Sequence, residues 1–258
     1  YGAVAPGYWA NLVVTDSLAD FRAESVFYHG RLVGRSGRPL FDAPPAATQP
    51  MGHAINIKSF SVWDLAFHWS GPTVPVMEIV PGQITTRWGA EPNRSVDGVV
   101  TSDISRDSVK AVVVERHRGT GNIGKGLVRG LGLKKGALAT SVAHDSHNIV
   151  AVGVADSDIF VAVTEVEANG GGLAVVEDGC VVASLPLPLA GLLSDMTLEK
   201  VVKALEELDA AAEKLGCCVD SPFSVLSFLA LPVVPELKLT DMGLVDVEMA
   251  QFLEPVRP

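Results

Sequence analysis

The 258-residue sequence has no hydrophobic run long enough to cross a membrane. Its two longest apolar segments, VVASLPLPLAGLL and PFSVLSFLALPVV, fall short of the roughly 18 residues that a spanning helix needs, and prolines interrupt both. The N-terminal segment YGAVAPGYWANLVV lacks the basic residues that open a secretory signal. These absences predict a protein without a membrane partner and outside the secretory pathway.

Cysteine is scarce, with only Cys180, Cys217 and Cys218 in the chain. An odd number of cysteines does not make a disulfide framework. Adjacent Cys217 and Cys218 cannot hold one metal as a CxxC pair does. We therefore expect all three to be packing residues in a reducing, cytoplasmic protein. A GxSxG segment, which marks many hydrolase serines, is also absent.

Basic residues are fewer than acidic residues: 20 Lys and Arg against 30 Asp and Glu give a net charge of −10. This balance argues against general affinity for nucleic acid or anionic lipid. Basic residues nevertheless gather between residues 110 and 135, where Glu115 is the sole acid. They are Lys110, Arg116, Arg118, Lys125, Arg129, Lys134 and Lys135. This basic island could face an anionic or electron-rich ligand, or be the solvated face of a twisted sheet.

The sequence has the composition of a globular protein, 48% hydrophobic with 25 Gly and 16 Pro. Most of the chain reads as short apolar runs separated by turn residues, which indicates strands. The fold class predicted is α+β: N-terminal strands, then a mixed β-sheet domain with a few helices. A Pro-, Gly- and Ala-rich stretch predicts a linker over 43–58 between residues 1–42 and a domain over 59–258.

Two segments carry helical signals. Asp156 and Asp158 are suited to cap a helix over IFVAVTEVEA, which the following glycines would end. A second helix is predicted over 197–215, where apolar residues recur at spacings of three and four and Gly216 follows. The recurring residues are Leu198, Val201, Leu205, Leu208, Ala212 and Leu215. Prolines in the C-terminal tail forbid a long helix there.

The segment GTGNIGKG, residues 119–126, matches the GxGxxG pattern of dinucleotide-binding proteins and nearly matches a phosphate loop. Both kinds of site require a helix directly after the glycines, because its N-terminus holds the phosphates. The sequence that follows is KGLVRGLGLKKG, whose glycines disfavour a helix. We therefore expect neither kind of site.

The most polar short segment is HDSHN, residues 144–148, set between two apolar runs. If those runs are strands, His144, Asp145, Ser146, His147 and Asn148 form the turn between them. Three interpretations stay open: a structural turn, a contact to substrate, and a metal site. The metal interpretation is the weakest, because His144 and His147 lack enough further ligands.

Three long segments of the chain are similar to the C-terminal region of the bacterial adenine deaminases, in the amidohydrolase superfamily. They are VERHRGTGNIGKGLVRGLGLKKGALATSVAHDSHNIVAVG, GGGLAVVEDGCVVASLPLPLAGLLSD and LSFLALPVVPELKLTDMGLVDV. The first strands, GAVAPGYWANLVVTDSLADFRAESVFYHGRLV, resemble those that complete the small β-sandwich of amidohydrolases. In that family the metals lie in a (β/α)₈ barrel whose ligands begin with an HxH motif, and no HxH occurs here.

The resemblance implies hydrolysis of adenine to hypoxanthine and ammonia in purine salvage, by a parent enzyme that this chain represents only in part. Manganese or iron would be held by the missing barrel, so no catalytic residue and no metal are expected in this chain. Substrate-side or interface contacts are expected from Arg116, His117 and the HDSHN residues. The parent is expected to be a homo-oligomer. A non-catalytic assembly module and a purine-binding module remain alternatives.

Overall fold

The computed structural model describes residues 2–42 and 54–253, and the chain divides into two compact units, residues 1–49 and 50–258. Most of the predicted linker, residues 43–53, lies outside the described residues. Its last part is described, and Asn56 donates its backbone N–H to the Arg116 carbonyl at 2.7 Å. Residues 54–58 therefore run along the second unit.

The first unit is a four-stranded antiparallel meander in the order β1-β2-β3-β4. Its strands are β1 (Leu12–Thr15), β2 (Ala23–Tyr28), β3 (Arg31–Arg35) and β4 (Arg38–Pro39). The β2–β3 turn is His29-Gly30, where both residues have positive φ. Throughout residues 2–42 every side chain is exposed or half-buried, so this unit has no closed core among its described residues.

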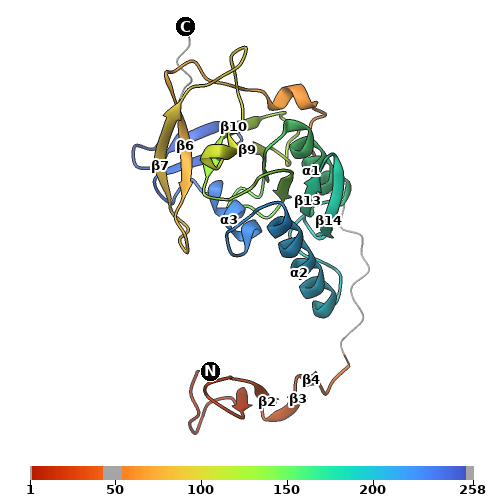
Figure 1. Ribbon diagram of the computed structural model, residues 1–258. Helices are drawn as coiled ribbons and strands as arrows, with labels where there is room; N and C mark the ends of the chain where they lie inside the picture. The colour runs from red at the N-terminus through yellow and green to blue at the C-terminus, as the bar shows by residue number, and fades with distance from the viewer. Residues whose placement is uncertain (1, 43–53, 254–258) are drawn as a thin grey trace. The chain divides into compact units, whose positions relative to one another are not determined.

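The second unit is built on an eight-stranded sheet in the order β14-β13-β11-β12-β9-β10-β6-β7 (Figure 1). Neighbouring strands are antiparallel except β10 and β6, which are parallel. The strands are β6 (Thr73–Ile79), β7 (Thr86–Pro92), β9 (Ser108–Val114), β10 (Ile123–Arg129), β11 (Ala137–Thr140), β12 (Ile149–Gly153), β13 (Gly172–Glu177) and β14 (Cys180–Pro186). The predicted α+β class is confirmed.

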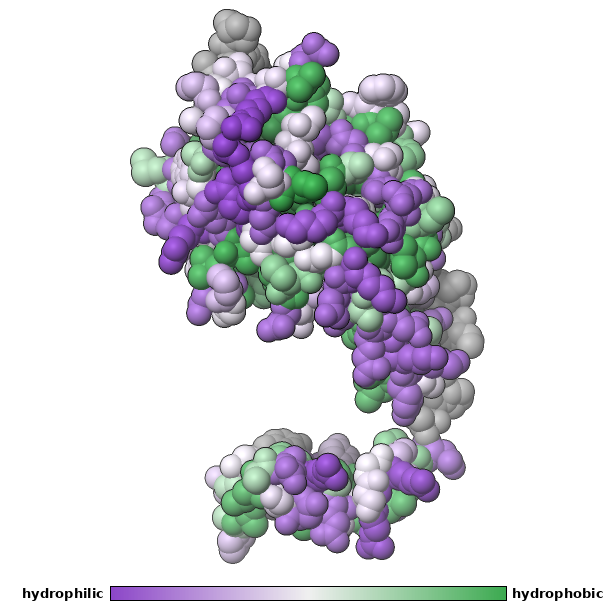
Figure 2. Space-filling view, in the orientation of Figure 1, coloured by the Kyte–Doolittle hydropathy of each residue, from purple (hydrophilic) through white to green (hydrophobic). Residues whose placement is uncertain are grey.

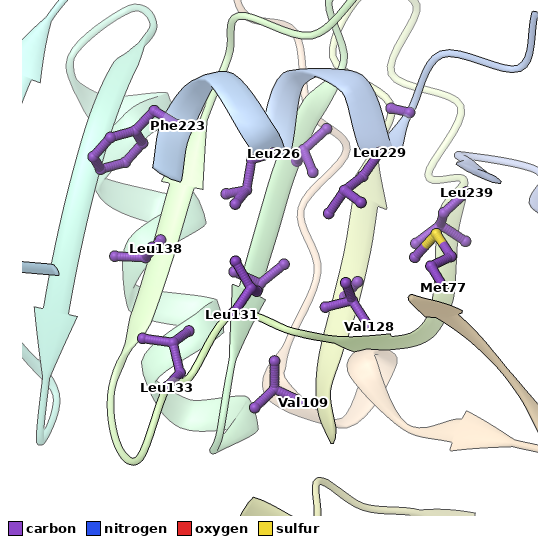
Figure 3. Close-up of a cluster of buried hydrophobic side chains, with 14 of the residues drawn as sticks. Met77, Val109, Val128, Leu131, Leu133, Leu138, Phe223, Leu226, Leu229 and Leu239 are labelled. Carbon is purple, nitrogen blue, oxygen red and sulfur yellow. The ribbon is translucent and has the colours of Figure 1, made fainter. Parts of the chain in front are cut away.

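Both faces of this sheet are covered, which explains why its central strands are continuous apolar runs. Along β9, Val109, Ala111 and Val113 belong to one hydrophobic cluster, while Val112 and Val114 belong to the other. Helix α1 (Asp156–Ala168) packs on the second face. Helices α2 (Leu198–Lys214) and α3 (Pro222–Leu229) pack on the first. Figure 3 shows side chains of α3 directed at the strands beneath it.

Smaller elements complete the second unit. A three-stranded sheet contains β15 (Leu237–Thr240), β16 (Gly243–Asp246) and β17 (Gln251–Phe252). A two-stranded ladder joins β5 (Phe67–His68) to β8 (Val99–Val100). Two short 3-10 helices are η1 (Val62–Leu65) and η2 (Ile104–Arg106). Among the helices in the described part of the chain, none is long and apolar enough to cross a membrane.

The two predicted helices are confirmed, but details of each differ. Asp156 and Asp158 are not caps: the helix starts at Asp156, which pairs with Lys110, while Asp158 accepts the Gly179 N–H at 2.7 Å. In α2, Leu208 is fully buried, whereas Leu198 is 74% exposed and Leu205 is also exposed. Val201 and Ala204 in the first half of α2 are partly buried against the core, so the apolar face predicted from the spacing packs fully only in the second half.

The cysteine prediction is wrong for two of the three residues. Cys217 is buried, but Cys180 and Cys218 are exposed, and all three are free thiols. Cys180 opens β14 next to the Asp178-Gly179 turn, at the sheet edge, where little covers its side chain. Burial raises the pKa of the Cys217 thiol.

The glycine-rich segment contains a strand in place of a helix, as its composition predicts. Gly124 and Gly126 lie within β10. A Cβ on Gly124 would meet the Thr240 carbonyl oxygen at 1.8 Å, and one on Gly126 would meet Leu244 at 2.9 Å. These glycines therefore allow the β15–β16 hairpin to lie directly on β10.

Candidate functional site

Two polar loops predicted from the sequence meet at one end of the large sheet. The first is the β9–β10 connection, residues 115–122, and the second is the β11–β12 connection, residues 141–148. Val114, the last residue of β9, pairs with both Ile123 and Ile149. Because β10 and β12 flank β9 in this register, the two loops must emerge side by side.

Arg116 connects these loops through its guanidinium. The side chain is 2% exposed, and its Nε donates to the His147 carbonyl. Its other nitrogens donate to the carbonyls of Ala54 at 2.9 Å and Ala190 at 3.1 Å. No carboxylate within the described residues forms an ion pair with it. Arg116 thus connects three segments by donating hydrogen bonds to a backbone carbonyl in each. The planar guanidinium offers several donors in fixed directions, which a lysine ammonium does not.

Glu115 organises the first loop from inside. Its carboxylate accepts the backbone N–H groups of His117 at 2.5 Å, Arg118 at 2.8 Å and Thr120 at 2.9 Å. The Thr120 hydroxyl adds a further hydrogen bond. Burial alone would raise the pKa of Glu115, but these hydrogen bonds favour the anion and lower the pKa to about 2. The loop is therefore folded around a carboxylate that stays ionised.

Further hydrogen bonds fix the position of the HDSHN segment. The Nε2 of His117 lies 2.7 Å from the Ser146 carbonyl, to which it donates as the Nε2–H tautomer. Buried Asn148 donates to Asp241 at 3.1 Å, and Asn122 donates to the other oxygen of that carboxylate at 3.1 Å. Asp241 thereby joins both loops to the β15–β16 turn.

The two histidines of HDSHN lie with their ring centroids 6.4 Å apart. The His144 ring also lies 4.8 Å from the ring of Phe228 in α3. His147 has φ +52, and its Nδ1 is buried without a hydrogen-bond partner in the described part of the chain. Burial lowers the pKa of His147, and the charges of Arg116 and His144 lower it further. At neutral pH His147 is uncharged and retains an unused ring nitrogen.

The structure therefore brings Arg116, His117, His144, Ser146, His147 and Asn148 into one connected cluster. Asp145 is exposed in the same loop. No group of three or more His, Cys, Asp or Glu side chains arranged to hold a metal occurs within residues 2–42 and 54–253. The arrangement can donate and accept hydrogen bonds to a polar ligand, but it does not form a metal centre.

Sequence reasoning missed Glu115, Asp241 and Phe228 as parts of this site. Glu115 had a usable signal, because it is the sole acid among the clustered basic residues and precedes a loop with several free N–H groups. The sequence held no such signal for Asp241 and Phe228, since each lies roughly 80 residues or more after the HDSHN segment and only the tertiary fold brings it near.

The basic island is not the solvated face of a sheet, because Lys110 and Arg116 are buried. Lys110 is buried and its Nζ lies 2.6 Å from Asp156 Oδ1. Arg129 pairs with Glu78 at 2.7 Å and with Glu91 at 2.8 Å. Lys135 pairs with Glu177, whereas Arg118 and Lys134 are simply exposed. The register of β9 and β10 puts Lys110, Lys125 and Arg129 on one face of the sheet. Arg116, Arg118, Lys134 and Lys135 lie in the connections outside these strands.

Comparison with known proteins places the chain in a family. Residues 83–251 match the family model described as adenine deaminase C-terminal domain. The chain is 51% identical to the adenine deaminase of Dehalococcoides mccartyi over 253 residues, and 45% identical to adenine deaminase 2 of Carboxydothermus hydrogenoformans over 247 residues. It is 43% identical to the adenine deaminase of Geobacillus kaustophilus over 257 residues.

These alignments cover 95–98% of this chain but only 43–44% of each relative. The chain thus spans less than half the length of the curated relatives it matches. The match includes both loops of the candidate site, which lie inside residues 83–251. The chain belongs to the adenine deaminase C-terminal domain family.

Proposed function

We propose that this chain is part of an adenine deaminase that hydrolyses adenine to hypoxanthine and ammonia. The observation that carries the proposal is 51% identity over 98% of the chain to a relative named adenine deaminase. In the proposed parent enzyme, the catalytic barrel lies in the portion of the relatives that this chain does not span. The parent would be a cytoplasmic homo-oligomer acting in purine salvage.

Manganese or iron in the parent enzyme belongs, in this proposal, to the barrel. The described residues of this chain do not fit a metal, because they form no group of three His, Cys, Asp or Glu ligands. His144 and His147, the weak metal candidates, supply only two rings. No step of the reaction is therefore assigned to a metal held here, and no residue of this chain is assigned as catalytic.

The two loops are proposed to supply substrate-side or interface contacts. Supporting this role, they are joined through Arg116, His117 and Asp241 although neither is needed to extend the sheet. The buried, unpartnered Nδ1 of His147 provides a hydrogen-bonding group that the described residues leave unused. An amino-purine or a loop of the barrel could satisfy it.

The first unit is proposed to pair with chain outside the described residues, as half of the small β-sandwich. Its described side chains are all at least partly exposed, and they include large apolar groups. Tyr8, Trp9, Val13, Phe21 and Tyr28 are each at least half exposed. Figure 2 shows polar and apolar side chains mixed over the visible side of this unit. An apolar surface of this kind is typical of an element that another segment covers.

A separate observation supports the alternative that this chain is a non-catalytic assembly module. The first half of α2 exposes Leu198, Val202 and Leu205, which would suit a subunit contact. In that case the domain would support oligomerisation and take no part in substrate binding. The purine-binding alternative rests only on the polar loops.

Calorimetry with adenine on this chain, followed by mixing it with the separately expressed remainder of the parent, tests the proposal. We expect little adenine binding by the chain alone and deaminase activity only in the mixture. Tight adenine binding by the chain alone would instead favour a purine-binding module. Activity of the remainder alone, unchanged when this chain is added, would favour the assembly module.

A further inference from the structure

A cavity of about 360 Å³ lies between the β6–β7 connection, the start of α3 and strand β15. Its volume is within the range of pockets that hold small molecules. Much of its wall is apolar, including Ile79, Val225 and Phe228. Arg116, His117 and the HDSHN residues do not line it, and Phe228, whose ring lies beside His144, is the residue that the cavity shares with the candidate site.

Lys238 lines this cavity and is fully buried. Its Nζ donates to the Ile84 carbonyl at 3.0 Å, and Ile84 also lines the cavity. That is the single hydrogen bond of its ammonium within the described residues, where it has no ion-pair partner either. An ammonium has three N–H donors, and a buried cation is normally paired.

Other buried cations in this unit are better satisfied, and Arg116, which has no acidic partner, donates to three carbonyls. Lys110 pairs with Asp156, and Arg129 pairs with two glutamates. Burial lowers the pKa of Lys238 to about 8, so the amine is still mainly protonated at neutral pH. The cavity wall therefore holds an ammonium that forms no ion pair with a described residue.

We propose that this cavity binds a small organic carboxylate. The Lys238 side chain, fully buried in this structure, would turn toward the ligand and donate its free N–H groups to the carboxylate, while an apolar body packs against Val225 and Phe228. A cationic ligand is disfavoured by Lys238. A polyphosphate is disfavoured because one lysine is the only basic residue in the wall and Asp220 also lines it.

Benzoate is a suitable probe, with benzamide as its neutral isostere, and binding to the intact protein is measured by calorimetry. We expect benzoate to bind and benzamide to bind about 10- to 100-fold more weakly, since a hydrogen bond to a charged group is lost. Lys238→Met should weaken benzoate binding by a similar factor. Lys134→Met removes an exposed lysine outside the cavity and should leave binding unchanged.

A second variant tests the proposal even if Lys238→Met fails to fold. Ser224 lines the cavity and is exposed in the first turn of α3, so Ser224→Phe should fill the cavity while leaving Lys238 in place. We expect this variant to lose benzoate binding as well, and wild-type affinity to fall as the pH rises above about 8. Absence of benzoate binding, equal binding of benzamide, or undiminished binding by Ser224→Phe would each overturn the proposal.

Discussion

At the scale of residues, the candidate site depends on charged groups that bind backbone. Glu115 binds three N–H groups of its own loop, and Arg116 binds carbonyls from three segments. Glu115 and Arg116, adjacent residues of opposite charge, thus organise one cluster. Such groups are costly to remove, because each leaves several backbone groups without a hydrogen bond.

Glu115→Gln should lower the free energy of unfolding at pH 7 by about 1–3 kcal/mol. The folded-state pKa of about 2 lies below the ordinary value of 4.5. The ionised form therefore stabilises the fold above pH 4.5, and this contribution is lost as the pH falls toward 2. Urea denaturation from pH 7 to pH 3 checks this, and the difference between variant and wild type should narrow below pH 4.5. Glu213→Gln, on the exposed side of α2, is the control.

Arg116→Met should destabilise the protein by about 2–4 kcal/mol, because three carbonyls lose their donor. The matched control is Arg118→Met, whose side chain is exposed in the same loop. Denaturant unfolding of both variants measures the difference. Equal stability of the two variants would mean that the guanidinium does not hold the loops together.

At the scale of elements, helix α2 shows how a surface helix can be half packed. Leu208, Ala212 and Leu215 are buried in the core and Val201 and Ala204 are partly buried against it, while Leu198, Val202 and Leu205 are exposed. Much of the visible surface of α2 is hydrophilic in Figure 2. The exposed apolar residues of its first half are consistent with a role in assembly.

Leu208→Ala should cost about 2–4 kcal/mol of unfolding free energy, since it removes a fully buried side chain from the core. Leu198→Ala, at a position 74% exposed, should change stability by less than about 0.5 kcal/mol. Both values can be read from denaturant melts of the single variants. Comparable losses for the two would show that the first half of α2 is also packed.

Periodicity predicted α2, the strand-rich second unit and the turn nature of HDSHN. The prediction of α1 came from Asp156, Asp158 and the following glycines, although neither Asp caps the helix. Rejection of a nucleotide site at GTGNIGKG also followed from composition, because its glycines lie in a strand. The burial of Leu198 and Cys180 was wrongly expected, since periodicity shows which face is apolar but not how far a neighbour extends. The convergence of the two site loops depends on the strand order β12-β9-β10, which no local pattern specifies.

At the scale of the whole molecule, the two units differ in kind. The second has two hydrophobic clusters on opposite faces of one sheet, whereas no described residue of the first is buried. The second unit has what independent folding requires, and the first does not.

A shortened chain of residues 50–258 should therefore unfold cooperatively, with a Tm within a few degrees of the 258-residue chain. A peptide of residues 1–42 should show no cooperative transition by circular dichroism. A sharp thermal transition of that peptide would contradict its assignment as part of a composite sheet.

In the proposed function, the joined loops contact the substrate of an adenine deaminase. The most direct test is steady-state kinetics of adenine deamination by the intact enzyme carrying His144→Ala or His147→Asn. Asn tolerates the positive φ at 147, and His68→Asn, at an exposed histidine in β5, is the control. We predict kcat/KM at least about tenfold lower for the two loop variants, with Tm nearly unchanged. Unchanged kcat/KM with a lowered Tm would contradict the claim and leave these histidines a purely structural role.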